Sequence, residues 1–112
     1  MMKQRVLVTG GAGFIGSNLI HCLKEKHEVF VLDNFSAGAS ENIQSVPGLA
    51  CDIREINNVP IRFSPDLVIH LAAINSLPYS VKHPKITYEI NVHGTAEVLK
   101  YCEKHNCPII FA

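Results

Sequence analysis

Short apolar runs recur along the chain, and turns or longer stretches of mixed polarity separate them. Continuous apolar runs of this kind are typical of strands that are covered on both faces, as in a parallel sheet. They predict five strands, at residues 5–8, 28–32, 49–51, 66–71 and 108–112. Residues 54–65 show no clean period, and we expect them to be irregular.

Two other stretches repeat their apolar residues at helical spacing. In the first, Ile15, Leu19 and Leu23 share one side, and polar residues take the other. The second predicts a long helix from Pro84, which suits a first turn because no needed N–H is lost there, to His105. Its apolar residues fall on one stripe, which contains Tyr88, Val92, Ala96, Leu99 and Cys102.

This order of strands and helices predicts an α/β fold of the Rossmann type, a doubly wound parallel sheet. Right-handed crossovers give the expected strand order 3-2-1-4-5. The chain has 112 residues, of which 47% are hydrophobic, so we expect one domain over residues 1–112. Because the sequence stops within the fifth strand, we interpret it as an N-terminal fragment that is truncated there.

The first predicted strand is followed by a glycine-rich turn, in the stretch VTGGAGFIGS. Two spacings overlap there, G-x-G-x-x-G and G-x-x-G-x-x-G, and both include Gly13 and Gly16. A glycine at position 13 lets a pyrophosphate approach the backbone, and one at position 16 lets the helix pack closely. The N–H groups near Phe14 and Ile15 begin the helix, where an anion is favoured. The alternative is a glycine-rich turn that binds no ligand.

Asp33 lies at the end of the second predicted strand, 20 residues after Gly13. An acidic side chain in that place can accept hydrogen bonds from an adenosine ribose. It would also repel a 2′-phosphate, by about 1 kcal/mol in water and about 4 kcal/mol at an effective dielectric of ~20. Asp33 therefore favours NAD over NADP, unless it is an ordinary solvated carboxylate.

Charge and cysteine usage exclude several other classes of protein. The ten basic and ten acidic residues cancel, which argues against nucleic-acid or anionic-membrane partners, and no apolar run approaches the ~20 residues of a membrane span. The four cysteines form no C-x-x-C motif and the six histidines form no cluster, so we expect no metal site. Buried or half-buried free thiols suggest a reducing, cytoplasmic location.

Five motifs, TGGAGFIGS, LDNFSAG, CDI, HLAA and NVHGT, follow one another along the chain. In this order they resemble the extended short-chain dehydrogenase/reductases, and more narrowly the NAD-dependent epimerase/dehydratase family that acts on nucleotide sugars. The resemblance implies NAD as cofactor and, for the full-length protein, an epimerase, dehydratase or decarboxylase of a nucleotide sugar. Such a reaction begins with hydride transfer from a sugar carbon to bound NAD.

The resemblance also assigns the cofactor-binding positions. The pyrophosphate loop contains Gly10, Gly13, Phe14, Ile15 and Gly16; the ribose acid is Asp33, and the polar loop after it contains Asn34, Ser36 and Gly38. Adenine is flanked by Asp52 and Ile53, and the cofactor passes Leu71, Ala72, Ala73 and the helix residue Asn91. For Asp52 a strand-end cap is the alternative, for the alanines a place in the core, and for Asn91 a structural bond to backbone. We interpret His70 as a core histidine.

One element of the family pattern is missing from the sequence. In the family the acid/base pair, Y-x-x-x-K, lies beyond the fifth strand, and it does not occur here, since the residue four places after Tyr79 is His83 and that after Tyr101 is His105. We therefore expect no catalytic residue and no turnover by these residues alone. The alternatives are a dinucleotide sensor without chemistry and a reductase of small carbonyl compounds. The resemblance also implies a homodimer formed through the long helix when the protein is complete.

Overall fold

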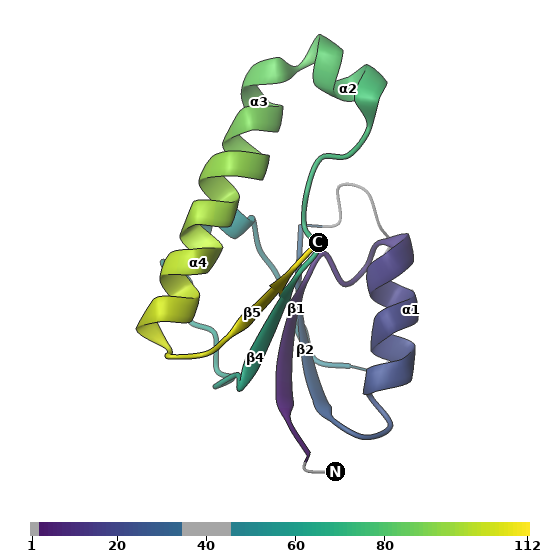
Figure 1. Ribbon diagram of the computed structural model, residues 1–112, viewed down its shortest axis with the longest axis vertical. Helices are drawn as coiled ribbons and strands as arrows, with labels where there is room; N and C mark the ends of the chain where they lie inside the picture. The colour runs from purple at the N-terminus through teal and green to yellow at the C-terminus, as the bar shows by residue number, and fades with distance from the viewer. Residues whose placement is uncertain (1–2, 35–45) are drawn as a thin grey trace.

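The computed structural model describes residues 3–34 and 46–112, which form a five-stranded parallel sheet with helices on both faces (Figure 1). The strands are β1 (Arg5–Thr9), β2 (Glu28–Asp33), β3 (Gly48–Ala50), β4 (Leu67–His70) and β5 (Ile109–Phe111). Their spatial order is β3-β2-β1-β4-β5, so the predicted order is confirmed. The predicted strand bounds differ from the observed ones by one residue or none at each end.

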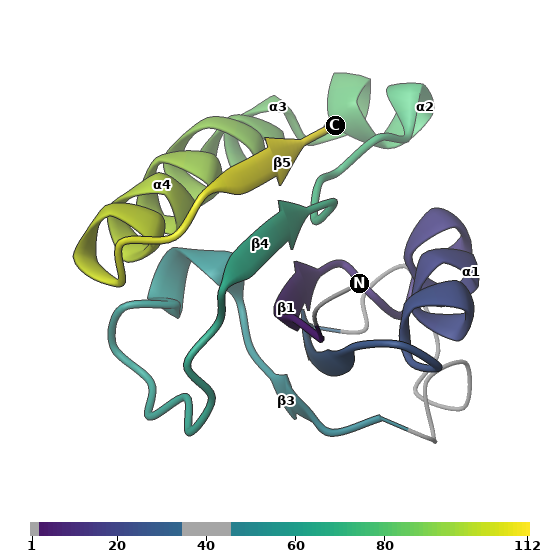
Figure 2. The same ribbon diagram turned by 60° about the horizontal axis from the view of Figure 1, so that its bottom comes forward.

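The helical elements connect these strands in the expected alternation. They are α1 (Phe14–Leu23), a short 3₁₀ turn η2 (Ile53–Glu55), α2 (Leu77–Lys82), α3 (Pro84–Tyr88), a π-helical turn η3 (Glu89–Gly94) and α4 (Thr95–Lys104). Figure 2 shows α1 on one side of the sheet and the α3–α4 run on the other. Residues 54–65 were expected to be irregular; Arg54 and Glu55 instead belong to η2, while residues 56–65 contain no helix or strand.

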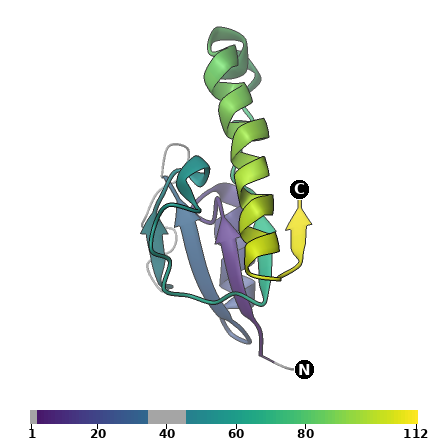
Figure 3. The ribbon, with the colours of Figure 1, turned by 90° about the vertical axis from the view of Figure 1, so that its left-hand side faces the viewer.

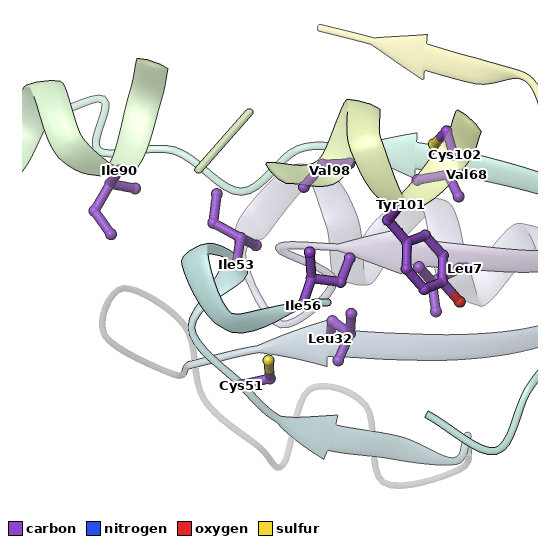
Figure 4. Close-up of a cluster of buried hydrophobic side chains, with 10 residues drawn as sticks. All are labelled: Leu7, Leu32, Cys51, Ile53, Ile56, Val68, Ile90, Val98, Tyr101 and Cys102. Carbon is purple, nitrogen blue, oxygen red and sulfur yellow. The ribbon is translucent and has the colours of Figure 1, made fainter. Parts of the chain in front are cut away.

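Each face of the sheet buries its own hydrophobic cluster, because alternate residues of one strand point to opposite faces. On the α1 side, Val6 and Val8 of β1 pack with Ile20 of the helix. On the other side, a second cluster joins the central strands, η2 and the long helical run (Figure 4). Its members are Leu7, Leu32, Cys51, Ile53, Ile56, Val68, Ile90, Val98, Tyr101 and Cys102.

The predicted long helix is one helical run from α3 through α4, and most of its predicted apolar stripe faces away from the core. Tyr88, Val92 and Leu99 are 64%, 51% and 47% exposed, whereas Cys102 is buried. The buried side instead contains Gly94, which lies so close to Ile53 that no Cβ would fit without a shift. The absence of a side chain at Gly94 thus lets this side of the run lie close to η2. Figure 3 shows the run extending past the end of the sheet.

Two further sequence expectations are corrected. The loop before the long helix contains the unpredicted helix α2, because the Ser76 hydroxyl caps it by accepting from the Tyr79 N–H at 3.3 Å and Pro78 lies in its first turn. The four cysteines are free thiols, but Cys22 is exposed rather than half-buried. It lies on the solvent side of α1, since Ile20 occupies the side that packs on the sheet.

Candidate dinucleotide-binding site

The glycine-rich turn between β1 and α1 begins with a residue that must be glycine. Gly10 has φ of +74°, and a Cβ there would lie 2.7 Å from the Ala72 backbone nitrogen. Its own N–H donates to the Leu32 carbonyl at 2.8 Å. The turn is therefore pressed against the backbone that leaves β4, in a left-handed conformation that other residues rarely adopt.

Gly13 and Gly16 differ in what surrounds them. A Cβ on Gly16 would collide with the Gly10 carbonyl oxygen and the Gly11 backbone, so the close approach at this glycine is to the turn rather than to the sheet, where it was expected. A Cβ on Gly13 would meet nothing nearer than the Gly10 carbonyl oxygen, at 3.5 Å. With φ of −74° and ψ of −179°, Gly13 also has a backbone that any residue adopts. Neither packing nor backbone geometry within the described chain explains a glycine at position 13.

The N-terminal end of α1 presents backbone donors. Gly13 is its N-cap, no side chain caps the helix, and its first turn contains no acidic residue. Phe14 and Ile15, which begin the helix, are 85% and 68% exposed. The first N–H groups of a helix lack intrahelical partners and carry the positive end of the helix dipole. This end can bind an anion, with apolar side chains at its rim.

Asp33, the predicted ribose acid, closes β2 beside this turn. Its side chain is buried, and Oδ2 accepts a hydrogen bond from the Ala12 N–H at 2.9 Å. The carboxylate is therefore tied to the glycine-rich turn itself, which places the end of β2 and the start of α1 in one site. Asn34 follows it and is exposed, whereas Ser36 and Gly38 lie outside the described residues.

Asp52, predicted to reach adenine, lies two residues after β3, the neighbouring strand at the edge of the sheet. Its Oδ1 caps η2 by accepting from the Arg54 backbone N–H at 2.9 Å. Its Oδ2 accepts a hydrogen bond from a guanidinium nitrogen of Arg54 at 2.7 Å. The same guanidinium reaches Glu89 Oε2 at 2.9 Å. The side-chain hydrogen bond from Arg54 holds the pKa of Asp52 below its ordinary value. Asp52 thus caps η2, and Arg54, which sequence reasoning missed, links it to the long helical run. The contact of Asp52 with adenine stays a prediction.

Ile53 and Asn91 have structural contacts in this region. The Ile53 side chain is buried in the core against Gly94. Asn91 lies in the π-helical turn, accepts from the Ile74 N–H at 2.8 Å and donates to the Ile74 carbonyl at 2.9 Å. Its amide therefore holds the backbone that follows Ala73, which is the structural alternative weighed for it. Their roles in binding the cofactor stay predictions.

The segment Leu71–Ala73 leaves β4 next to Gly10, with Ala73 exposed and the other two half-buried. The Leu71 and Ala72 N–H groups point at the Thr9 hydroxyl, at 3.1 and 3.2 Å. Thr9 was missed as a site residue, although a hydroxyl at the end of an apolar strand, directly before the glycines, was a usable signal. His70 is 1% exposed and hydrogen-bonded at both ring nitrogens, so its assignment as a core histidine is confirmed.

Other kinds of site are absent from the described parts of the chain. Residues 3–34 and 46–112 contain no group of three His, Cys, Asp or Glu side chains that could hold a metal. Within the same residues, no helix has the length and apolar character needed to cross a bilayer. A hollow of about 500 Å³ between α2 and α3, lined by residues 82–86 and Glu89, includes none of the predicted cofactor residues.

The tyrosines that precede histidines by four residues form ring pairs rather than acid/base sites. Tyr79 and His83 have ring centroids 4.5 Å apart, and Tyr101 and His105 have centroids 4.1 Å apart. Tyr101 is 3% exposed, and burial raises its pKa to about 12. A phenol with so high a pKa is a poor proton donor or acceptor near neutral pH.

The geometry of the turn fits an adenine dinucleotide. The open space at Gly13 would be filled by a side chain, the N–H groups at the tip of α1 suit phosphate oxygens, and the Asp33 carboxylate suits ribose hydroxyls. Binding at the carboxyl ends of the strands, where the order reverses between β1 and β4, is the general rule for such sheets. NAD bound there would supply a hydride acceptor.

The chain is similar to several known nucleotide-sugar enzymes. The chain is 41% identical over 105 residues to a UDP-glucose 4-epimerase of Halalkalibacterium halodurans, covering 90% of the chain and 31% of that protein. It is 35% identical to a CDP-paratose 2-epimerase of Salmonella typhi, covering 97% and 36%. The chain thus spans about a third of the length of these relatives.

Solved structures show the same fold. A UDP-glucose 4-epimerase of Thermus thermophilus in complex with NAD matches with a TM-score of 0.81 and 38% identity over 91% of this chain and 34% of that one. A UDP-glucose 4-epimerase of Thermotoga maritima with UDP-glucose matches with a TM-score of 0.85 and 33% identity, over 96% and 37%. The family model described as NAD dependent epimerase/dehydratase matches residues 6–112, and the chain belongs to this NAD-dependent family.

Proposed function

We propose that this chain is the NAD-binding part of a nucleotide-sugar epimerase or dehydratase. The pyrophosphate lies against the N–H groups of Phe14, Ile15 and Gly16, and the adenosine ribose bonds to Asp33. The single observation that carries the proposal is Gly13, whose missing side chain leaves open space at an uncapped helix N-terminus. Membership of an NAD-dependent family supports the choice of dinucleotide.

The reaction class follows from the relatives, several of which are named as epimerases or decarboxylases of nucleotide sugars. NAD supplies a hydride acceptor in such chemistry. The residues of this chain bind and orient the dinucleotide, while the 112 residues contain no tyrosine followed four places later by lysine. We therefore propose that they do not convert a sugar nucleotide on their own, and the substrate's sugar and nucleotide stay open.

Titration calorimetry with NAD tests the proposal through Gly13→Ala. Because the nearest atom to the new Cβ is 3.5 Å away, the variant folds as the parent does. We expect its NAD affinity to fall about tenfold or more, since the methyl group occupies the space of the pyrophosphate. Cys22→Ala, at an exposed position of the same helix, is the matched control and binds as the parent does. Equal affinity of all three proteins, or no binding by the parent, would refute the proposal.

A sensor without chemistry is the competing function. A helix N-terminus that presents backbone N–H groups can bind NAD without any chemistry, so the site by itself is compatible with both functions. Both functions predict NAD binding, so a second assay separates them. Incubation of the NAD-loaded full-length protein with UDP-glucose, followed by sugar analysis, supports the enzyme if a new sugar nucleotide forms. The sensor is supported if NAD binds tightly and the sugar is unchanged.

The exposed apolar residues of the helical run suggest a homodimer. Tyr88, Val92 and Leu99 lie on a helical run whose opposite side packs on the core. We propose that this face covers its counterpart on a second copy, as expected from the family resemblance. Sedimentation of the full-length protein tests it: Leu99→Glu should shift the population to monomer, whereas a dimer unchanged by the substitution would place the contact elsewhere.

A further inference from the structure

A chain of buried hydrogen bonds runs below the proposed dinucleotide site and connects three elements. The Thr9 hydroxyl, at the end of β1, lies 2.6 Å from His70 Nδ1 at the end of β4. On the other side of the ring, Nε2 lies 2.9 Å from the Thr95 hydroxyl of α4. All three side chains are at least 91% buried, and Thr9 and His70 occupy paired positions in the parallel ladder.

The number of donors and acceptors at Thr9 determines the direction of each hydrogen bond in this series. The Thr9 Oγ1 accepts from the Ala72 N–H and also from the Leu71 N–H. The Leu71 nitrogen also donates to the Thr9 carbonyl oxygen, at 3.0 Å. A hydroxyl has two acceptor positions and one proton, so the proton that remains points at His70 Nδ1. His70 is therefore a neutral imidazole that accepts at Nδ1 and donates from Nε2 to Thr95.

Burial supports this neutral form. Desolvation holds the pKa of His70 below its ordinary value of 6.5. The hydrogen-bond and aromatic partners of the ring are Thr9, Thr95 and Phe111, whose ring centroid lies 5.5 Å away, and none of them ionises. The acceptor at Nδ1 is thus present throughout the neutral pH range.

We propose that His70 is a positioning residue for the dinucleotide. By accepting the Thr9 proton, it turns the hydroxyl's lone pairs toward the Leu71 and Ala72 N–H groups and fixes that backbone against Gly10. The contact is close, because a Cβ on Gly10 would lie 2.7 Å from the Ala72 nitrogen and 2.9 Å from the Leu71 carbonyl carbon. A shift of this backbone would therefore move the glycine-rich turn. The inference rests on the proposed function.

Two substitutions at Thr9 test the inference in the 112-residue chain. Thr9→Val keeps the branched shape but removes the hydroxyl, and we expect the NAD dissociation constant to rise about tenfold. Thr9→Ser restores the hydroxyl and should return the affinity to within about twofold of the parent, as expected for a hydrogen-bond effect. In the absence of NAD, amide exchange at Ala72 should be faster in Thr9→Val than in the parent and slow again in Thr9→Ser.

Thr95→Val is the matched control, because it removes the other partner of the same ring and leaves Thr9 in place. A purely structural role for His70 predicts that both valine variants lower stability and affinity together. The positioning role predicts that Thr95→Val lowers stability with NAD affinity within about twofold of the parent, while Thr9→Val lowers affinity. If NAD affinity and amide exchange at Ala72 are both unchanged in Thr9→Val, the inference about His70 is wrong while the proposed function still stands. Failure of the parent to bind NAD would overturn the proposed function, and with it the link from His70 to the cofactor.

Discussion

Asp33 ends β2 and Asp52 follows the neighbouring strand β3 by two residues, yet the two carboxylates are held by different kinds of donor. Asp33 is buried and accepts from a backbone amide of the glycine-rich turn. Asp52 is 30% exposed at its side chain and is held by the guanidinium of Arg54. Asp33 therefore links β2 to the proposed phosphate site, whereas Asp52 links the edge of the sheet to the long helical run through Glu89.

This difference shows what a motif position decides and what it leaves open. Both carboxylates lie at the carboxyl edge of the sheet, where ligands of such folds bind. The partner then determines the role, because a backbone amide orients a carboxylate without cancelling its charge, while a guanidinium also supplies the opposite charge. We therefore expect Asp33 to matter mainly for the cofactor and Asp52 mainly for the fold.

The largest expected effect is at Asp33. Asp33→Asn keeps an oxygen that can accept from Ala12, but it removes the charge that strengthens bonds to ribose hydroxyls. We expect NAD affinity to fall about 100-fold, which corresponds to about 2.7 kcal/mol, and the preference over NADP to disappear. Calorimetric titration with both dinucleotides measures this. Retained preference for NAD would contradict the role given to Asp33.

A smaller effect is expected where the helical run contacts η2. Gly94→Ala would place a Cβ 2.5 Å from Ile53 Cδ1 and 2.8 Å from its Cγ1, so we expect a loss of about 2 kcal/mol in the free energy of unfolding. Urea unfolding provides the measurement. Adding Ile53→Ala to this variant removes the clashing atoms. The double variant should therefore lose less unfolding free energy than the sum of the losses in the two single variants. Strict additivity would contradict the close contact.

The smallest expected effect is at Arg54. Arg54→Met leaves Asp52 and Glu89 without their partner, and because the pair is partly solvated we expect a loss of about 1 kcal/mol in unfolding free energy. NAD affinity should change less than in Asp33→Asn, and calorimetry of both variants compares them directly. A larger loss of affinity in Arg54→Met would reverse the ranking of the two carboxylates.

The same variant has a pH signature. Since the folded pKa of Asp52 is below its ordinary 3.8, the Arg54 bond stabilises the protein above about that pH, and the stabilisation is lost as the pH falls through the folded pKa. In Arg54→Met, the loss of stability that comes from protonation of Asp52 should be absent. In the control variant Lys24→Met, which changes the exposed C-cap residue of α1, this loss should remain. Chemical unfolding between about pH 2 and 6 measures the difference. An identical acid profile in parent and Arg54→Met would contradict it.

Much of this fold could be predicted from the sequence because its determinants are local. The apolar strands around Leu7 and Val68, and the turn that requires glycine at Gly10, follow from residue type and spacing. The partner of Gly94 could not be predicted, because Ile53 lies on the separate turn η2 and the two residues meet only in the folded chain. The Thr9–His70 bond was also missed, since it joins residues 61 positions apart whose pairing exists only in the folded sheet.

Amide NMR of the 112-residue chain during titration with NAD tests the central claim most directly. The account predicts that the largest chemical-shift changes occur at the backbone amides of Phe14, Ile15 and Gly16, with further changes at Ala12, whose N–H bonds to Asp33. Changes confined to the hollow between α2 and α3 around Glu89, with the amides at the start of α1 unmoved, would contradict it.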